Sequence, residues 1–113
     1  TPVSAPLVRG ILAVATASTS TPLTSEQAVE LYRARFEGHP FVKVVTGREP
    51  ECAPVAGTNY VEVRPRATAD GRLHAVCAID NLVKGGAGQA VQSLNLMLGC
   101  PETTALDWSG TWP

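Results

Sequence analysis

Hydrophobic positions along the chain follow different periods in different segments, and each period predicts an element. The first strongly apolar stretch, residues 10–17, has no charged side chain and is partly β-branched. Such a short run predicts a strand buried on both faces, although its periodicity alone is equally compatible with a buried helix. The preceding segment includes Pro2 and Pro6, which exclude a helix interior, so we expect residues 1–6 to be extended.

Apolar residues recur at helical spacing between positions 25 and 37, and charged residues lie largely elsewhere around the same segment. Thr24 and Gln27 fit a capping box at its start. Gly38 and Pro40 would end it. The pattern therefore predicts one amphipathic helix over residues 25–37.

Three shorter segments have the pattern of strands. Residues 41–45 form an apolar, β-branched run, and residues 59–64 and 72–79 read as two further strands. An Asp-Gly pair at positions 70–71 tolerates a positive φ, so we expect these two strands to form an antiparallel hairpin. Residues 47–57, which contain two prolines, are expected to form a loop.

The last structured segment opens with three glycines in four positions, 85–88, and continues as a predicted helix over residues 89–98. Four apolar side chains of this segment fall on one side: Ala87, Val91, Leu94 and Leu98. The tail that follows carries Trp108 and Trp112, which we expect to cover an apolar surface. The order β-α-β-β-β-α predicts an α+β fold with a mainly antiparallel sheet and packed helices.

The composition is that of one small domain or of part of a larger one. Of the 113 residues, 44% are hydrophobic and 17% charged, which suffices for a core. The net charge of −1 gives no support for a nucleic-acid or anionic-membrane partner, because both require a basic surplus. No apolar stretch approaches the about twenty residues of a membrane span. The chain starts at Thr1 without a leader, so we expect it to be trimmed or cut from a longer protein.

The three cysteines, Cys52, Cys77 and Cys100, are widely spaced and form no Cys-x-x-Cys pair. This sparse, odd number predicts a reducing compartment and no metal site. His39 and His74 are expected to be structural, because no local motif indicates a Ser-His-Asp or Cys-His arrangement. The residues alone therefore indicate no catalytic group.

Candidate chemistry is concentrated in the glycine-rich segment. Without β-carbons, Gly85, Gly86 and Gly88 allow the backbone to approach a ligand closely, at a cost in helix stability. The start of a helix favours anions, and Lys84 beside it suggests an anionic partner. Tight helix packing, with Lys84 paired to Asp80, explains the same residues equally well.

Arg9 is a second candidate, at the entry to the first long strand. An arginine there can bind a carboxylate or a phosphate in a bidentate manner. A structural ion pair is the alternative.

A resemblance to a known family extends along the chain. Residues 80–92, Asp-Asn-Leu-Val-Lys-Gly-Gly-Ala-Gly-Gln-Ala-Val-Gln, and the Pro-Glu-Thr at 101–103 resemble the C-terminal signature of N-acetyl-gamma-glutamyl-phosphate reductases. The Thr-Pro-Val at 1–3 and the Arg-Gly-Ile-Leu-Ala at 9–13 resemble the same family's strand-entry motif. The match is in the right order and corresponds to roughly the last third of such an enzyme.

The resemblance implies an NADPH-dependent reduction of N-acetyl-glutamyl 5-phosphate to the semialdehyde in arginine biosynthesis, through a cysteine nucleophile and an assisting histidine. The family's Gly-Cys-Tyr-Pro, His-x-His and dinucleotide segments are not among these residues, so no catalytic residue is assigned. The resemblance implies that Asn81, Lys84, Gly85 and Gly88 line the NADP site. Arg9 would face the acyl-phosphate substrate or a subunit contact.

The same resemblance implies an organisation in two parts. Residues 1–80 would belong to the α+β catalytic and dimerisation domain, which is like that of glyceraldehyde-phosphate dehydrogenase. Residues 81–113 would pack on the N-terminal NADP-binding region of a cytoplasmic homo-oligomer. A non-catalytic dimerisation or interaction domain is one alternative, and a reductase of aminoadipyl or aspartyl phosphate is another.

Overall fold

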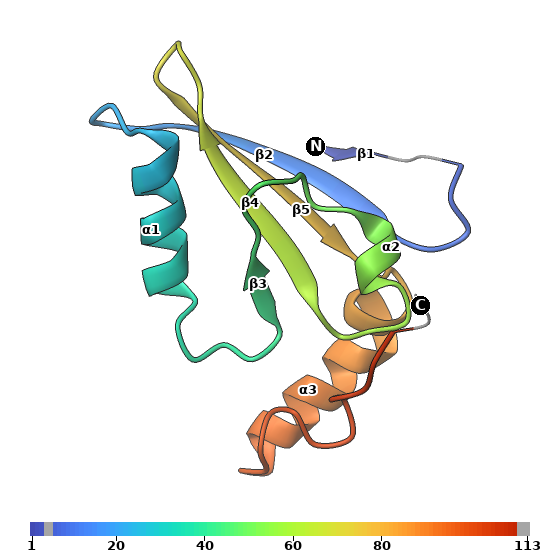
Figure 1. The fold of residues 1–113 in the computed structure, drawn as a ribbon. Coiled ribbons are helices and arrows are strands. Elements are labelled where there is room, and N and C mark those ends of the chain that lie inside the picture. The colour runs from blue at the N-terminus through green and yellow to red at the C-terminus, as the bar shows by residue number, and fades with distance from the viewer. Residues whose placement is uncertain (4–5, 111–113) are drawn as a thin grey trace.

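The computed structural model describes residues 1–3 and 6–110, so Ser4, Ala5 and the predicted role of Trp112 lie outside it. The elements, in chain order, are β1 (Pro2–Val3), β2 (Ile11–Ser18), α1 (Ser25–Arg35), β3 (Val42–Val44), α2 (Cys52–Val55), β4 (Val61–Ala67), β5 (Arg72–Ile79), a π-helical turn η1 (Val83–Ala87) and α3 (Gly88–Met97). The strands form one sheet in the order β1-β2-β5-β4-β3 (Figure 1). The α+β class is confirmed.

The sheet is mainly antiparallel, as expected. β2 pairs with β5, β5 with β4, and β1 with β2 in antiparallel register, whereas β3 and β4 are parallel. The hairpin between β4 and β5 is confirmed: Ala67 lies opposite Leu73, and Gly71 has a φ of +77° in the turn. The Asp-Gly pair tolerates the positive φ that this turn needs, which favours the observed register.

α1 begins with the predicted capping box: Gln27 N–H donates to Thr24 Oγ1, and Thr24 N–H donates to Gln27 Oε1. The helix lies beside β4 (Figure 1), and the Ser25 hydroxyl oxygen accepts a hydrogen bond from the Ala67 N–H at 3.1 Å. Pro65 has no N–H to present along the same strand. Together these features block the part of the β4 edge that β3 does not cover.

Two expectations were wrong. Residues 10–17 do form a strand, but β2 is half-buried in its first half and exposed in its second, rather than buried on both faces. In the described residues its outer neighbour β1 is only two residues long. Residues 47–57 are not wholly a loop, because α2 occupies Cys52–Val55. Pro54 did not prevent this helix, since proline is tolerated in a first turn.

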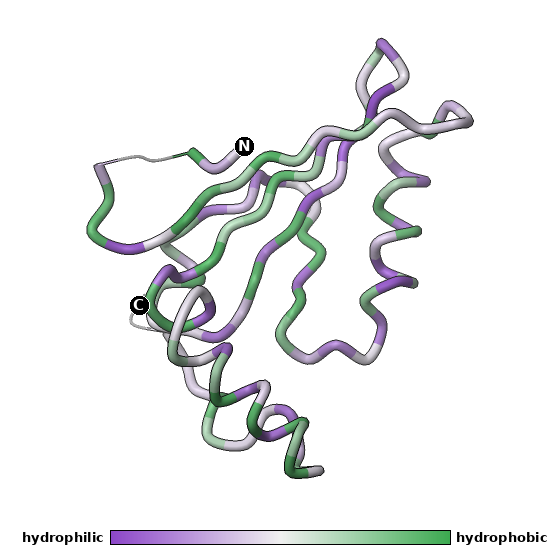
Figure 2. The backbone as a smooth tube through the Cα atoms, turned by 180° about the vertical axis from the view of Figure 1, so that it is seen from behind, coloured by the Kyte–Doolittle hydropathy of each residue, from purple (hydrophilic) through white to green (hydrophobic). Residues whose placement is uncertain are grey.

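The helix α3 turns its polar side inward. Its buried residues are Gly88, Gln92 and Asn95, whereas Val91 and Leu94 are 37% and 51% exposed. Hydrophobic residues recur along the length of α3 (Figure 2). The pattern predicted the helix and its apolar side, but that side is the outer one.

The chain exposes more surface than a folded monomer of its size. Its accessible area is 7026 Å², against about 5,900 Å² expected for 11.8 kDa. Its radius of gyration is 15.0 Å, against about 13 Å for a domain of this length. The described ranges contain no helix that is both long and apolar enough to cross a membrane.

Candidate functional site

Asp80 stands at the end of β5, where the glycine-rich segment begins, and its side chain is fully buried. Its Oδ1 atom accepts hydrogen bonds from the N–H groups of Leu82 and Val83, at 2.8 and 2.7 Å. Its Oδ2 atom accepts hydrogen bonds from the Gly57 N–H at 2.7 Å and from Arg9 Nε at 3.0 Å, and forms an ion pair with Arg9 Nη2, also at 3.0 Å. A single carboxylate thus joins the start of η1, the loop before β4 and the segment before β2.

The environment of Asp80 favours its ionised form. Burial alone would raise the pKa of this carboxyl group, but the N–H donors of Gly57, Val83 and Leu82, and the side chain of Arg9, outweigh it. The pKa of Asp80 therefore lies below its ordinary value. A stable negative charge at this point compensates the guanidinium of Arg9.

A second link lies beside the first. The Gly10 N–H donates to Asn81 Oδ1 at 2.7 Å, across 71 positions of sequence. Gly10 has a φ of +112°, and a Cβ there would be 2.5 Å from the Cβ of Cys52, so only glycine fits. The fold therefore brings together Arg9 and Asn81, two of the predicted site residues. A role in binding stays a prediction for both.

Lys84 does not pair with Asp80, so that alternative was wrong. Its Nζ atom donates to Gln92 Oε1 at 2.6 Å and lies 5.5 Å from the centre of the Phe41 ring. Burial lowers the pKa of Lys84, and the nearby Glu102 carboxylate partly opposes this. The amine is thus half-buried and is held by a neutral oxygen rather than by a directly bonded carboxylate.

Gln92 is the centre of a polar cluster beneath α3. Besides Lys84, its Oε1 atom accepts a hydrogen bond from Asn59 Nδ2 at 2.8 Å, and its Nε2 donates to Glu102 Oε1. One turn further on, Asn95 Nδ2 donates to the carbonyl oxygen of Glu102 at 3.2 Å. These hydrogen bonds explain how polar side chains occupy the buried side of the helix. Among the described residues, Asn59 Oδ1 has no hydrogen-bond partner.

The glycines of this segment differ in their surroundings. A Cβ on Gly88 would lie 2.5 Å from Asn59 Oδ1 and 2.7 Å from Val83 Cγ1, so Gly88 serves close packing. A Cβ on Gly85 would have ordinary contacts, the nearest at 3.4 Å, and a Cβ on Gly86 would meet only a carbonyl oxygen at 3.7 Å. Both of these glycines are exposed. Tight packing thus accounts for one glycine, and an accessible backbone remains at the other two.

Several residues that matter here gave little signal in the sequence. Asp80 precedes the glycine-rich turn, where aspartate is a preferred cap, and this was the available clue. Gly57, Asn59 and Gln92 gave none, because their contacts join distant segments. Trp108, expected to cover an apolar surface, is 42% exposed, and its indole Nε1–H donates to the Gly57 carbonyl oxygen at 2.7 Å, so it is a polar anchor of the tail.

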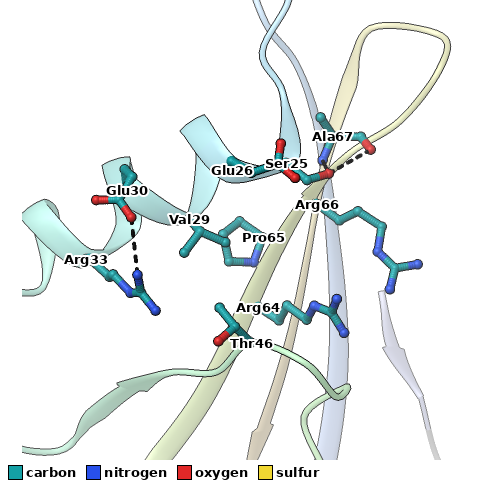
Figure 3. A pocket seen from close by; sticks show the side chains of 10 residues that line it. All are labelled: Ser25, Glu26, Val29, Glu30, Arg33, Thr46, Arg64, Pro65, Arg66 and Ala67. Carbon is teal, nitrogen blue, oxygen red and sulfur yellow. Dashed lines mark hydrogen bonds and ion pairs between the residues drawn. The ribbon is translucent and has the colours of Figure 1, made fainter.

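A separate hollow of about 530 Å³ lies between the start of α1 and β4, with Val29 facing Pro65 (Figure 3). Three arginines line it, and each is paired with a carboxylate: Arg33 with Glu30, and both Arg64 and Arg66 with Glu49. The three guanidinium groups thus share two carboxylates. None of the predicted site residues lies in this hollow.

The described residues contain no cluster of His, Cys, Asp and Glu that could hold a metal ion. The three cysteines are free thiols in this structure. Burial raises the pKa of Cys52 and of Cys77, which makes their thiolate forms scarce. Neither has the environment of a reactive cysteine.

Comparison with known proteins places this geometry in context. Residues 1–81 match the family model described as "Semialdehyde dehydrogenase, dimerisation domain". A protein of Thermus thermophilus named N-acetyl-gamma-glutamyl-phosphate reductase is 49% identical over 100% of this chain and 33% of its own length. A protein of the same name from Frankia casuarinae is 51% identical over 100% of this chain and 34% of its own length. The chain thus spans about a third of the curated relatives it matches.

Among solved structures, aspartate semialdehyde dehydrogenase II of Vibrio cholerae, in complex with ASA, superposes with a TM-score of 0.67. The superposition covers 83% of this chain and 28% of that protein, at 23% sequence identity. This likeness shows that the fold is shared.

Proposed function

The chain belongs to the family of semialdehyde dehydrogenase dimerisation domains, and from this premise we propose that it is the C-terminal part of an NADPH-dependent N-acetyl-gamma-glutamyl-phosphate reductase. The longer enzyme would convert N-acetyl-glutamyl 5-phosphate to N-acetyl-glutamate 5-semialdehyde in arginine biosynthesis. The observation that carries this proposal is the similarity of the whole chain, from its first residue to its last, to reductases of that name.

The arrangement of α3 supports attachment to a further part of the same enzyme. Its outer side carries Val91, Leu94 and Leu98, which are 37–68% exposed, while its polar side is satisfied internally. A helix with this arrangement normally has a partner over its apolar side. The excess of accessible surface over that of a folded monomer is in accord with this. We therefore propose that residues 81–113 pack on the NADP-binding region and that residues 1–80 build the subunit interface of a homo-oligomer.

The proposed NADP site comprises Asn81, Lys84, Gly85 and Gly88. Gly85 and Gly86 expose bare backbone in the turn that leads into α3. Lys84 directly precedes them and supplies a positive charge, although its amine is held by Gln92 in this structure. These features fit the anionic groups of a dinucleotide. Gly88 would act indirectly, by allowing the turn to close against the residues below it. When bound, NADPH supplies the hydride that reduces the acyl group.

Within the same proposal, Arg9 binds the anionic end of the substrate. Its side chain is 39% exposed, and its guanidinium group is paired with the buried Asp80 carboxylate. An arginine fixed in this way needs little reorganisation when a carboxylate or phosphate binds. The same carboxylate caps the start of η1 through Leu82 and Val83. Asp80 would thus fix the position of Arg9, which binds the substrate, relative to the glycine-rich segment that binds NADP.

The experiment for substrate identity uses the longer protein that contains this chain. Its NADPH consumption is measured with N-acetyl-glutamyl, aspartyl and aminoadipyl phosphates. We expect the highest kcat/KM for the N-acetyl-glutamyl compound, by about tenfold or more. A preference for either of the other two acyl phosphates would contradict the proposed substrate and leave the reaction class intact.

The remaining parts of the proposal follow from the same assignment. We propose a cytoplasmic enzyme, since arginine biosynthesis takes place among soluble metabolites. The formal net charge of the chain is −1, so we propose no nucleic-acid partner, which would require a basic surplus. If the longer protein sedimented as a monomer, the proposal that it forms a homo-oligomer would be wrong.

A further inference from the structure

The tail of the chain is held at two successive residues against the segment that leads into β4. The Tyr60 hydroxyl group donates to Asp107 Oδ1 at 3.0 Å. The next residue, Trp108, donates its indole Nε1–H to the Gly57 carbonyl oxygen at 2.7 Å, although its side chain is partly exposed. The tail therefore makes specific polar contacts, and its position is not set by apolar packing alone.

Gly57 links this tail to Asp80. Its N–H donates to Asp80 Oδ2 at 2.7 Å, and the same oxygen accepts the hydrogen bond from Arg9 Nε and pairs with Arg9 Nη2. Gly57 has a φ of +74°, a conformation natural to glycine, and a glycine backbone rotates more freely than any other. The hydrogen bond from Trp108 thus restricts the backbone of Gly57, the residue that connects the tail to the Asp80 carboxylate.

We propose that Trp108 is a positioning residue for the Arg9 guanidinium, acting through the Gly57 backbone and the Asp80 carboxylate. The inference rests on the proposed function, in which Arg9 binds the anionic end of the substrate. If Gly57 shifts, Asp80 Oδ2 loses a donor, and the carboxylate can tilt about Oδ1, which the N–H groups of Leu82 and Val83 still hold. In the described part of the chain, the hydrogen bond and the ion pair of the Arg9 guanidinium both go to that one oxygen, so Arg9 moves with it. Trp108 itself touches no reacting group.

The test uses the longer protein carrying Trp108→Phe, which keeps an aromatic ring and removes the N–H donor. Tyr60→Phe is the matched control, because it removes one hydrogen bond from the same tail without touching Gly57. We expect Trp108→Phe to raise KM for the acyl phosphate by about threefold to tenfold, with kcat and the KM for NADPH little changed. Tyr60→Phe should leave all three values near those of the unsubstituted enzyme.

A double-mutant cycle with Arg9→Lys gives the readout that a purely structural role would not move. If Trp108 acts through Arg9, adding Trp108→Phe to Arg9→Lys should not raise KM further. Additive effects, or an equal rise of KM in Tyr60→Phe, would overturn the positioning role and leave the proposed function standing. Absence of any acyl-phosphate reduction by the unsubstituted longer protein would overturn both.

Discussion

Arg9 and Asp80 lie 71 positions apart in the sequence, yet two guanidinium nitrogens of Arg9 approach a single carboxylate oxygen of Asp80 at 3.0 Å. The pair joins the segment before β2 to the end of β5. Because Asp80 also caps the glycine-rich turn, the geometry of the candidate site depends on this one carboxylate.

Replacing the carboxylate should destabilise the chain. Asp80→Asn puts an amide in a buried position surrounded by donors, so we expect a loss of about 2–3 kcal/mol in the free energy of unfolding. The loss is smaller than for a fully buried pair, because Arg9 is 39% exposed and solvent screens its charge. Urea unfolding measures it. Glu30→Gln, which breaks an exposed pair with Arg33, serves as the control and should cost about 0.5 kcal/mol or less.

Stability should also depend on pH through Asp80. The folded-state pKa of Asp80 lies below its ordinary value of 3.8, so folding favours the carboxylate. The stability that this group contributes is present above that ordinary value and is lost as the pH falls through the folded-state pKa. Unfolding free energies measured from about pH 6 down to about pH 2 should fall less steeply at the acid end in Asp80→Asn. Equal slopes for both proteins would refute this role.

Two glycines three positions apart should respond differently to alanine. In Gly88→Ala the new Cβ would lie 2.5 Å from Asn59 Oδ1 and 2.9 Å from the Val83 carbonyl oxygen. We expect a loss of about 1–3 kcal/mol from overpacking, despite the better helix propensity of alanine. Gly85→Ala has a nearest contact of 3.4 Å and should stay within about 1 kcal/mol of the parent. Thermal or urea unfolding of both variants decides the comparison, and equal losses would contradict it.

Substitutions on the apolar side of α3 should lower stability only in the longer protein, where this side has a partner. Leu94 is 51% exposed in this structure, so Leu94→Glu should change the stability of the 113-residue chain by less than about 0.5 kcal/mol. In the longer protein the same change would bury a charge and should cost about 2 kcal/mol or more. Ser93→Glu, on another side of the same helix, should leave the stability of both proteins nearly unchanged. If Leu94→Glu left the stability of the longer protein unchanged, this side of α3 would not pack on the NADP-binding region.

Local features were predictable because their causes are local. The capping box of Thr24 and Gln27 and the turn at Gly71 each depend on residues within a few positions, and both are confirmed. The helix near the C-terminal end followed from its period of apolar residues. Predictions of this kind need no knowledge of the tertiary structure.

The remaining features depend on contacts between distant segments. Gln92 and Asn95 are buried because Asn59, Glu102 and the nearby backbone satisfy their polar atoms, and no periodicity reveals such partners. For the same reason the pattern found the apolar side of α3 without showing that it faces outward. The exposure of β2 has a related origin, since an apolar run predicts burial only when something covers it.

The most direct test of the central claim compares the 113-residue chain with the longer protein in an assay for NADPH-dependent reduction of N-acetyl-glutamyl 5-phosphate. The account predicts turnover by the longer protein and none by the purified chain alone. Robust turnover by the chain alone would contradict its assignment as one part of the enzyme, and no turnover by the longer protein would contradict the assigned reaction.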